Sequence, residues 1–235
     1  MKKWCKSNVV YYGLGLCMCV CLSVGLLSLL VDKEIKERKR PYPIKSVQEE
    51  ENESGKEKAI RVVIKTNGFK EVEHKEVVVR AKSGMCIRSD AQTRECKPNE
   101  EIKILPDDKM FQKGAIQILP KEGGDKINIV SLKRGYGAPE YRGKLELHST
   151  EKGIAIVNEL PLEEYLYAVV PSEMPASYSL EALKVQAVCA RSYAEKQTKG
   201  FAYPQYKAHV DDSTEYQVYG NSREQESTIR AVNET

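Results

Sequence analysis

Residues 160–193 constrain the fold of this chain most, because they place two helices and a proline-bracketed turn directly one after another. The segment reads LPLEEYLYAVVPSEMPASYSLEALKVQAVCARSY. Pro161 suits the first turn of a helix, where amides lack helical partners, and Pro171 predicts the end of that helix because its ring clashes with the preceding turn. We therefore expect Glu173 to lie on a stiff loop between the helices.

The second helix has its own start and stop residues. Ser179 is a favourable N-cap, and Gly200 followed by Pro204 predicts the exit. Apolar residues recur at helical spacing and extend beyond one stripe, which predicts a mostly buried helix; they are Leu180, Leu183, Val185, Ala187, Val188, Cys189, Ala190 and Ala194. Arg191 lies within this helix, so its guanidinium needs an acidic or carbonyl partner, and Glu173 or a substrate is a candidate.

Three segments of the chain carry a family resemblance. LPLEEYLYAVVPSEMP, SLEALKVQAVCARSYA and DDSTEYQVYG resemble the stage II sporulation protein D family, which includes the amidase enhancers. The resemblance covers the chain from residue 141 to its end and is weaker from residue 60. It implies a membrane-anchored lytic transglycosylase that acts on peptidoglycan during engulfment in an endospore-forming bacterium.

The N-terminal part of the chain predicts a membrane anchor. Residues 9–31 contain no charge, and 23 residues of helix give about 35 Å, enough to cross a bilayer. A cleaved signal peptide is the alternative, although its apolar part is usually shorter and ends in small residues. Basic residues flank both ends of the run, so the resemblance alone makes residues 1–8 a cytoplasmic tip and the C-terminal domain extracytoplasmic, on a single-pass protein of the cell membrane.

Residues 32–58 predict a charged stalk, because they hold eight basic and eight acidic residues with few apolar ones. Residues 59–235 then hold 26 Lys/Arg and 26 Asp/Glu. A nucleic-acid-binding protein shows a basic surplus or stripe, so this balance excludes nucleic acid as a partner.

Residues 59–158 predict a β-rich module, so the fold class is α+β: a transmembrane helix, this module, and then a helical segment. Ile60, Val62 and Ile64 alternate with polar neighbours, and Asn67-Gly68 predicts a hairpin whose return strand is residues 77–79. Later alternating pairs predict further strands: Ile102 and Ile104, Ile116 and Ile118, Ile127 and Ile129, Leu145 and Leu147, Ile154 and Ile156. Residues 121–125 and 135–139 predict loops.

Two cysteines of the β-rich module, Cys86 and Cys96, leave two alternatives open. Outside the membrane they can form a disulfide, and otherwise they are two buried or free thiols. The cysteines form no C-x-x-C pair and the three histidines are scattered, so we expect no metal and no cofactor.

Glu173 is the candidate acid/base. Glycan cleavage requires a carboxylic acid to protonate the glycosidic oxygen, and the apolar neighbours of Glu173 disfavour its charged form. In a lytic transglycosylase the C6 hydroxyl of the sugar is the nucleophile, so one carboxyl group suffices. The resemblance places the family's catalytic glutamate on Glu173 through PSEMP, whereas the residues alone also fit a solvated loop glutamate. Glu163 and Glu164 are weaker candidates, since carboxylates in a first helical turn complement the helix dipole.

Substrate-binding or supporting roles are expected for a second set of residues. Arg191 corresponds to the family's ARSY arginine, which implies that it orients the substrate or Glu173; a buried arginine that ties the helix to the sheet is the alternative. The DDSTEYQVYG motif gives side chains that can bind sugar hydroxyls or stack on a sugar ring, or that form a turn and pack in the core. The full set is Arg191, Ser172, Asp212, Ser213, Gln217 and Tyr219.

The sequence ends at Thr235, where members of the family continue, so we expect residues 159–235 to be the N-terminal, incomplete part of the catalytic-type domain. Three functions stay open: a lytic transglycosylase that binds peptidoglycan glycan strands, a non-catalytic wall-binding amidase enhancer, and a structural member of an engulfment complex with other proteins of that complex as partners.

Overall fold

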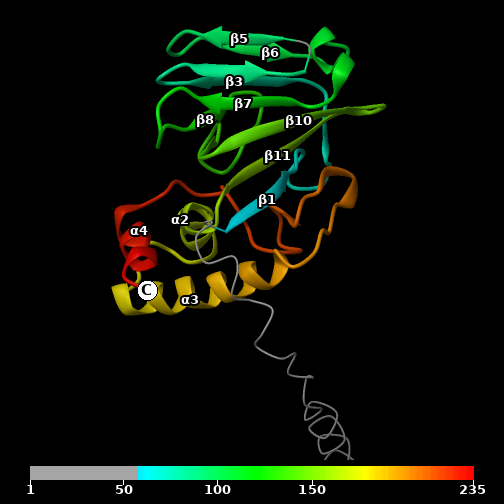
Figure 1. Ribbon diagram of the computed structural model, residues 1–235. Helices are drawn as coiled ribbons and strands as arrows, with labels where there is room; N and C mark the ends of the chain where they lie inside the picture. The colour runs from blue at the N-terminus through cyan, green and yellow to red at the C-terminus, as the bar shows by residue number, and fades with distance from the viewer. Residues whose placement is uncertain (1–57, 91) are drawn as a thin grey trace, which may run out of the picture. The chain divides into compact units, whose positions relative to one another are not determined.

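The computed structural model describes residues 58–90 and 92–235 (Figure 1). The described residues form one compact unit. The predicted cytoplasmic tip, transmembrane helix and all of the stalk except Lys58 lie outside the described residues. Among the described residues no helix has the length and apolar character needed to span a bilayer. The predicted fold class is corrected to what the structure describes: the described residues form a β-rich fold with three α-helices, and none of these helices is a membrane-spanning one.

The larger sheet has eight strands, seven of them in one continuous order (Figure 1). In that order they are β12 (Val210–Asp211), β1 (Ala59–Ile64), β11 (Gly153–Pro161), β10 (Lys144–Thr150), β7 (Ile116–Pro120), β4 (Met85–Arg88) and β5 (Thr93–Cys96). The eighth strand, β2 (Glu73–His74), pairs with Ile154 and Ala155 at the N-terminal end of β11. The neighbours are antiparallel except β1 and β12, which are parallel.

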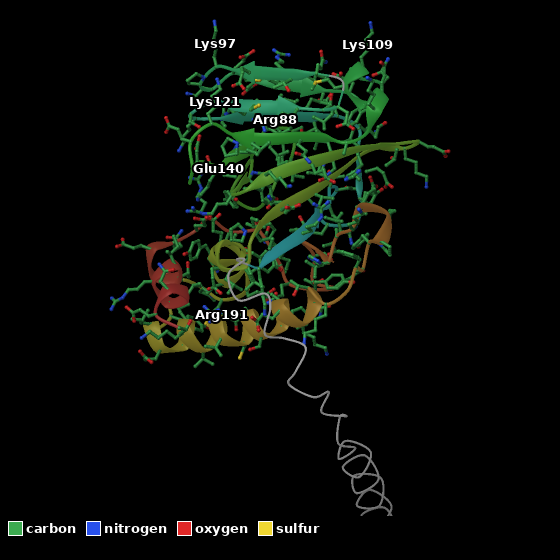
Figure 2. All side chains as sticks on the ribbon, in the orientation of Figure 1. Arg88, Lys97, Lys109, Lys121, Glu140 and Arg191 are labelled. Atoms are coloured by element: carbon green, nitrogen blue, oxygen red, sulfur yellow. The ribbon has the colours of Figure 1, made fainter. Side chains whose placement is uncertain are left out.

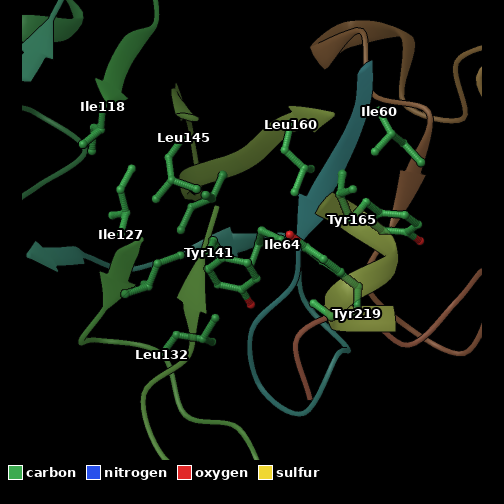
Figure 3. Packing of buried hydrophobic residues seen from close by; sticks show 14 of the residues in the cluster. Ile60, Ile64, Ile118, Ile127, Leu132, Tyr141, Leu145, Leu160, Tyr165 and Tyr219 are labelled. Carbon is green, nitrogen blue, oxygen red and sulfur yellow. The ribbon is translucent and has the colours of Figure 1, made fainter. Parts of the chain in front are cut away.

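The smaller sheet has four strands and packs against the same core. Their order is β6 (Ile102–Ile104), β3 (Val77–Ala81), β8 (Ile127–Ile129) and β9 (Glu140–Tyr141). The alternating isoleucine, valine and leucine pairs predicted these strands because each pair points its side chains to the buried face. Figure 3 shows such residues from both sheets, including Ile118, Ile127 and Leu145, around Tyr141.

The predicted hairpin after the first strand is wrong. Asn67 and Gly68 do form a tight turn, which is closed by the bridge between Thr66 and Glu71. The chain then crosses to the other sheet, where β3 pairs with β6 and β8. The two edges of β1 are occupied by β11 and β12, and both of those strands come from distant sequence that local turn residues do not indicate.

Three α-helices cover the end of the larger sheet that holds β1 and β12 (Figure 1). They are α2 (Leu162–Glu173), α3 (Leu180–Gln197) and α4 (Glu226–Asn233). Two short 3-10 helices lie elsewhere in the described chain: η1 (Lys109–Lys113) precedes β7, and η2 (Pro204–Tyr206) precedes β12. Ser179 caps α3 as predicted, accepting a hydrogen bond from the Ala182 amide. The helix is less buried than predicted, since Val185, Val188 and Cys189 are exposed.

The predicted boundary between the β-rich module and the helical segment falls inside one strand. β11 runs from Gly153 to Pro161 without interruption and leads directly into α2. The later strand β12 then returns beside β1, with Val210 opposite Val62. The helical segment therefore shares one hydrophobic core with the strands that precede it, as the contact of Tyr165 and Tyr219 with strand residues in Figure 3 illustrates.

Cys86 and Cys96 are both buried, free thiols. Cys96 lies opposite Met85 in the pairing of β4 with β5, so Cys86 and Cys96 point to opposite faces of the sheet. A disulfide needs Cβ atoms that face each other. Of the two alternatives that the sequence leaves open, the structure has the two thiols.

A partly buried charged network on β1, β10 and β11 is expected to make stability depend on acid pH. His148, 2.8 Å from the Glu146 carboxylate, and Arg61, which donates hydrogen bonds to it, lower the pKa of Glu146 from 4.5 to about 2. Stability from this group is present above about pH 4.5 and is lost as the pH falls towards 2. We expect Glu146→Gln to remove about 2 kcal/mol of unfolding free energy at neutral pH and to flatten the acid limb.

Urea unfolding followed across this pH range measures the effect. Glu76→Gln is the matched control, because Glu76 pairs with Lys103 but its side chain is 43% exposed, so it contributes little. An acid limb of the same steepness in Glu146→Gln and in the unaltered protein would contradict the assignment.

Candidate active site

The last turn of α2 carries the predicted acid/base. Pro171 lies inside this turn rather than ending the helix, and Glu173 is the final helical residue. Met174 is extended, with φ −137° and ψ 133°, because the residue before a proline avoids the helical region. The predicted end of the helix at Pro171 is thus too early, and Glu173 lies in the last turn of α2 and not on a loop.

The Glu173 carboxylate is exposed and is held by one main-chain donor. Its Oε1 accepts a hydrogen bond of 2.6 Å from the amide of Val218. Its Oε2 makes no hydrogen bond or ion pair within the described residues. One carboxylate oxygen is therefore oriented by the protein, and the other faces away from protein partners.

Arg191 does not pair with Glu173. Its Nε and Nη2 donate to the two carboxylate oxygens of Glu163, both at 2.8 Å, and Nη2 also donates to the Val232 carbonyl. The hydrogen bonds to Glu163 raise the pKa of Arg191. Figure 2 shows Arg191 on α3. The arginine thus ties α3 to the first turn of α2 and to α4. From the sequence, the alternative to a substrate contact was an arginine that ties this helix to the sheet, but the structure shows a tie between helices.

Ser172 fixes the chain that passes over the end of α2. Its hydroxyl donates to the Ala168 carbonyl at 2.6 Å and accepts from the amides of Asn221 and Ser222, at 3.1 and 3.2 Å. The serine therefore stabilises the segment after Gly220. Its hydroxyl donates one and accepts two hydrogen bonds within the protein, so it has no hydrogen-bonding capacity left for a substrate.

Asp212 and Ser213 are buried. The Asp212 carboxylate accepts from the Lys65 amide at 3.0 Å and from Nη2 of Arg134 at 2.5 Å. Burial raises the pKa of Asp212, and Arg134 opposes this shift. The Ser213 hydroxyl donates to Asp211 at 2.6 Å. Both residues therefore stabilise the loop by hydrogen bonds within the protein. This agrees with the alternative interpretation of the motif, in which these residues form a turn and pack in the core.

Gln217 and Tyr219 are also buried and bonded to protein. The Gln217 amide lies 3.4 Å from both the Tyr165 hydroxyl and the Ala190 carbonyl. The Tyr219 hydroxyl donates to Asn158 at 2.7 Å, and its ring lies 4.8 Å from that of Tyr165. In this arrangement neither the Tyr219 ring nor the Gln217 amide is free to contact a sugar. Among the predicted catalytic and supporting residues, Glu173 is the one that is exposed.

Two contributors to the site are not indicated by the sequence. The Val218 donor is a main-chain amide, so no side-chain pattern predicts it. Arg134 lies in a Gly-rich turn and meets Asp212, which follows it by 78 positions in the sequence. No group of three or more potential metal ligands is gathered among the residues that the structure describes.

Residues 150–235 match the family model for the stage II sporulation protein (SpoIID), so this part of the chain is a domain of that family. The match begins at the end of β10 and includes all three α-helices. It contains every predicted site residue, but it leaves out Arg134.

Curated relatives agree with this family. The chain is 47% identical over 70 residues to the amidase enhancer of Bacillus subtilis, covering 30% of this chain and 9% of the relative. It is 43% identical over 70 residues to the stage II sporulation protein D of the same species, covering 29% and 20%. An uncharacterised protein of Brachyspira hyodysenteriae is 39% identical over 97 residues, covering 41% and 26%. The matches thus span about a quarter or less of each relative, and no solved structure matches the chain.

Proposed function

We propose that this chain acts on peptidoglycan in the cell envelope as a lytic transglycosylase, with Glu173 as general acid and base. The observation that carries the proposal is the state of this carboxylate: it is exposed, one oxygen is held by the Val218 amide, and the other has no partner among the described residues. The kinship with sporulation protein D supports the substrate class.

In the proposed reaction the free Oε2 carries the proton. Glu173 donates it to the glycosidic oxygen as the bond to the anomeric carbon breaks, and the Val218 amide keeps Oε1 hydrogen-bonded as the carboxylate becomes charged. The carboxylate then accepts the proton of the C6 hydroxyl as that oxygen bonds to the anomeric carbon. The products are a shortened glycan strand and a 1,6-anhydromuramic end, and no water is consumed.

The test uses purified glycan strands freed of stem peptides. The protein is incubated with them, and the released fragments are analysed by mass spectrometry. We expect ends that are lighter by one water than those left by a hydrolase. Hydrolytic ends, or strands left intact at all protein concentrations, would refute the proposed reaction.

A second candidate is a non-catalytic activator of a wall amidase. The observation that favours it is the pairing of Arg191 with Glu163, which leaves Glu173 with no cation among its bonded partners, together with the likeness to the amidase enhancer. This function predicts faster release of stem peptides by an added amidase and an unchanged length of the glycan strands.

Arg191→Lys separates a helix tie from a substrate contact. Lysine cannot donate the two parallel hydrogen bonds that Glu163 accepts. We expect a loss of about 1 kcal/mol in unfolding free energy, since Glu163 is 43% exposed, and an unchanged KM for glycan strands. A raised KM with unchanged stability would show instead that Arg191 binds the substrate.

A further inference from the structure

Arg134 is a buried cation that the family match leaves out and the proposed reaction does not use. It lies in the turn between β8 and β9, and its side chain is 1% exposed. Its Nη2 donates both to the Lys65 carbonyl at 2.6 Å and to Asp212 at 2.5 Å. A buried charge is costly unless it is paired, so this arginine holds these two groups together.

The partners of Arg134 lie at the base of one loop, residues 213–218. Asp212 precedes the loop, and its carbonyl accepts a hydrogen bond from the amide of Tyr219, which follows the loop. The Asp212 amide donates to Val63, and its carboxylate accepts from Lys65, so the base of the loop is bonded to the end of β1. Both ends of the loop therefore meet at the residue that Arg134 binds.

The loop delivers the one donor that orients Glu173. Val218 is the last residue of the loop, and its amide hydrogen-bonds Glu173 at 2.6 Å. Thr214 and Glu215, at the other end of the loop, are exposed. Beyond its base, the loop is held by weaker attachments: Gln217 through contacts of 3.4 Å, the exposed Glu215 through an ion pair of 3.8 Å with Lys65, and Tyr216 through packing on the core. The base is buried and is held by shorter hydrogen bonds.

A strained turn, residues 67–69, packs on the Arg134 guanidinium. Phe69 stacks over Arg134, with the guanidinium carbon 4.0 Å from the ring centroid. Phe69 and Asn67 have φ values of 67° and 49°, in the left-handed region of the backbone that residues other than glycine rarely adopt. Such strain persists where surrounding contacts over-determine it, and it is found at functional sites.

We propose that Arg134 is a positioning residue for Glu173: it binds Asp212, fixes the base of the 213–218 loop, and so sets the place of the Val218 amide that orients the carboxylate. The importance of Glu173 in this inference rests on the proposed function, whereas the positioning itself does not. The inference extends the candidate site to the turn between β8 and β9, outside residues 150–235.

Amide hydrogen exchange of Val218 tests the inference directly. In Arg134→Lys and in Asp212→Asn we expect the Val218 amide to exchange about tenfold faster relative to the Val157 amide of β11, a change equal to about 1.4 kcal/mol of local opening. Asp212→Asn provides the second variant if the lysine substitution prevents folding. If the unaltered protein forms anhydro product, we expect both variants to have a lower kcat and an unchanged KM. The reason is that the Glu173 carboxylate is displaced while the surface that binds the glycan strand is not.

Arg142→Lys is the matched control. Arg142 also reaches the same C-terminal segment, through two hydrogen bonds of 2.9 Å to Glu224, but beyond the loop. Faster Val218 exchange in the two loop-base variants and not in this control supports the inference. Unchanged relative exchange in both, or an equal rise in the control, overturns it. If the unaltered protein releases no anhydro product, the proposed function fails while the exchange result still decides the positioning.

Discussion

If the proposed reaction holds, Glu173→Gln is expected to lower the release of 1,6-anhydro ends from glycan strands by at least about a hundredfold, the range for loss of a general acid. Glutamine has the same shape as glutamate, and its Oε1 can still accept the hydrogen bond from Val218. The variant therefore keeps the fold and the orientation of the side chain but has no proton to give. Binding of glycan strands, measured by co-sedimentation, is expected to be unchanged.

Glu164→Gln controls for the loss of one carboxylate from the same helix. Glu164 lies in the first turn of α2, at the opposite end from Glu173, and its substitution is expected to leave product release within about twofold. Full activity of Glu173→Gln would transfer the acid role to another group. Equal losses in the two variants would show a general effect of charge on the helix.

Local sequence patterns predicted the parts of the fold that local physics determines. The alternating pairs Ile116/Ile118 and Leu145/Leu147 became strands because each strand buries one face. Ser179 predicted the start of α3 because its hydroxyl satisfies an amide of the first turn. Strand partners were not predicted: β1 pairs with β11 and β12, about 100 and 150 residues away.

The site follows the same division. The motifs located Glu173 but not its orientation, because the orienting donor is a main-chain amide supplied from 45 residues further along the chain. They selected Asp212, Gln217 and Tyr219 as sugar contacts, yet these side chains are buried and bonded to Arg134, Tyr165 and Asn158. A polar residue in a motif serves the loop architecture or the substrate equally well, and only three-dimensional burial separates these roles.

Gly143→Ala is expected to cause the largest loss of stability. Gly143 has a φ of 71°, and a Cβ there would lie 2.3 Å from the Glu159 carbonyl oxygen and 2.7 Å from Cβ of Leu160. The strained backbone conformation costs about 1 kcal/mol, and the overlap adds about 1–3 kcal/mol because β10 and β11 must separate. Since β11 leads directly into α2, their separation also moves the helix that carries Glu173.

Gly124→Ala isolates the contribution of the overlap. Gly124 has a similar φ of 83°, but a Cβ there would meet no atom within 4 Å. We expect this control to lose only the conformational cost of about 1 kcal/mol in urea unfolding, so the difference between the two variants measures the close approach of β10 to β11. Equal losses would show that the turn relaxes away from Glu159, in which case Gly143→Ala would also leave the exchange of the Val218 amide unchanged.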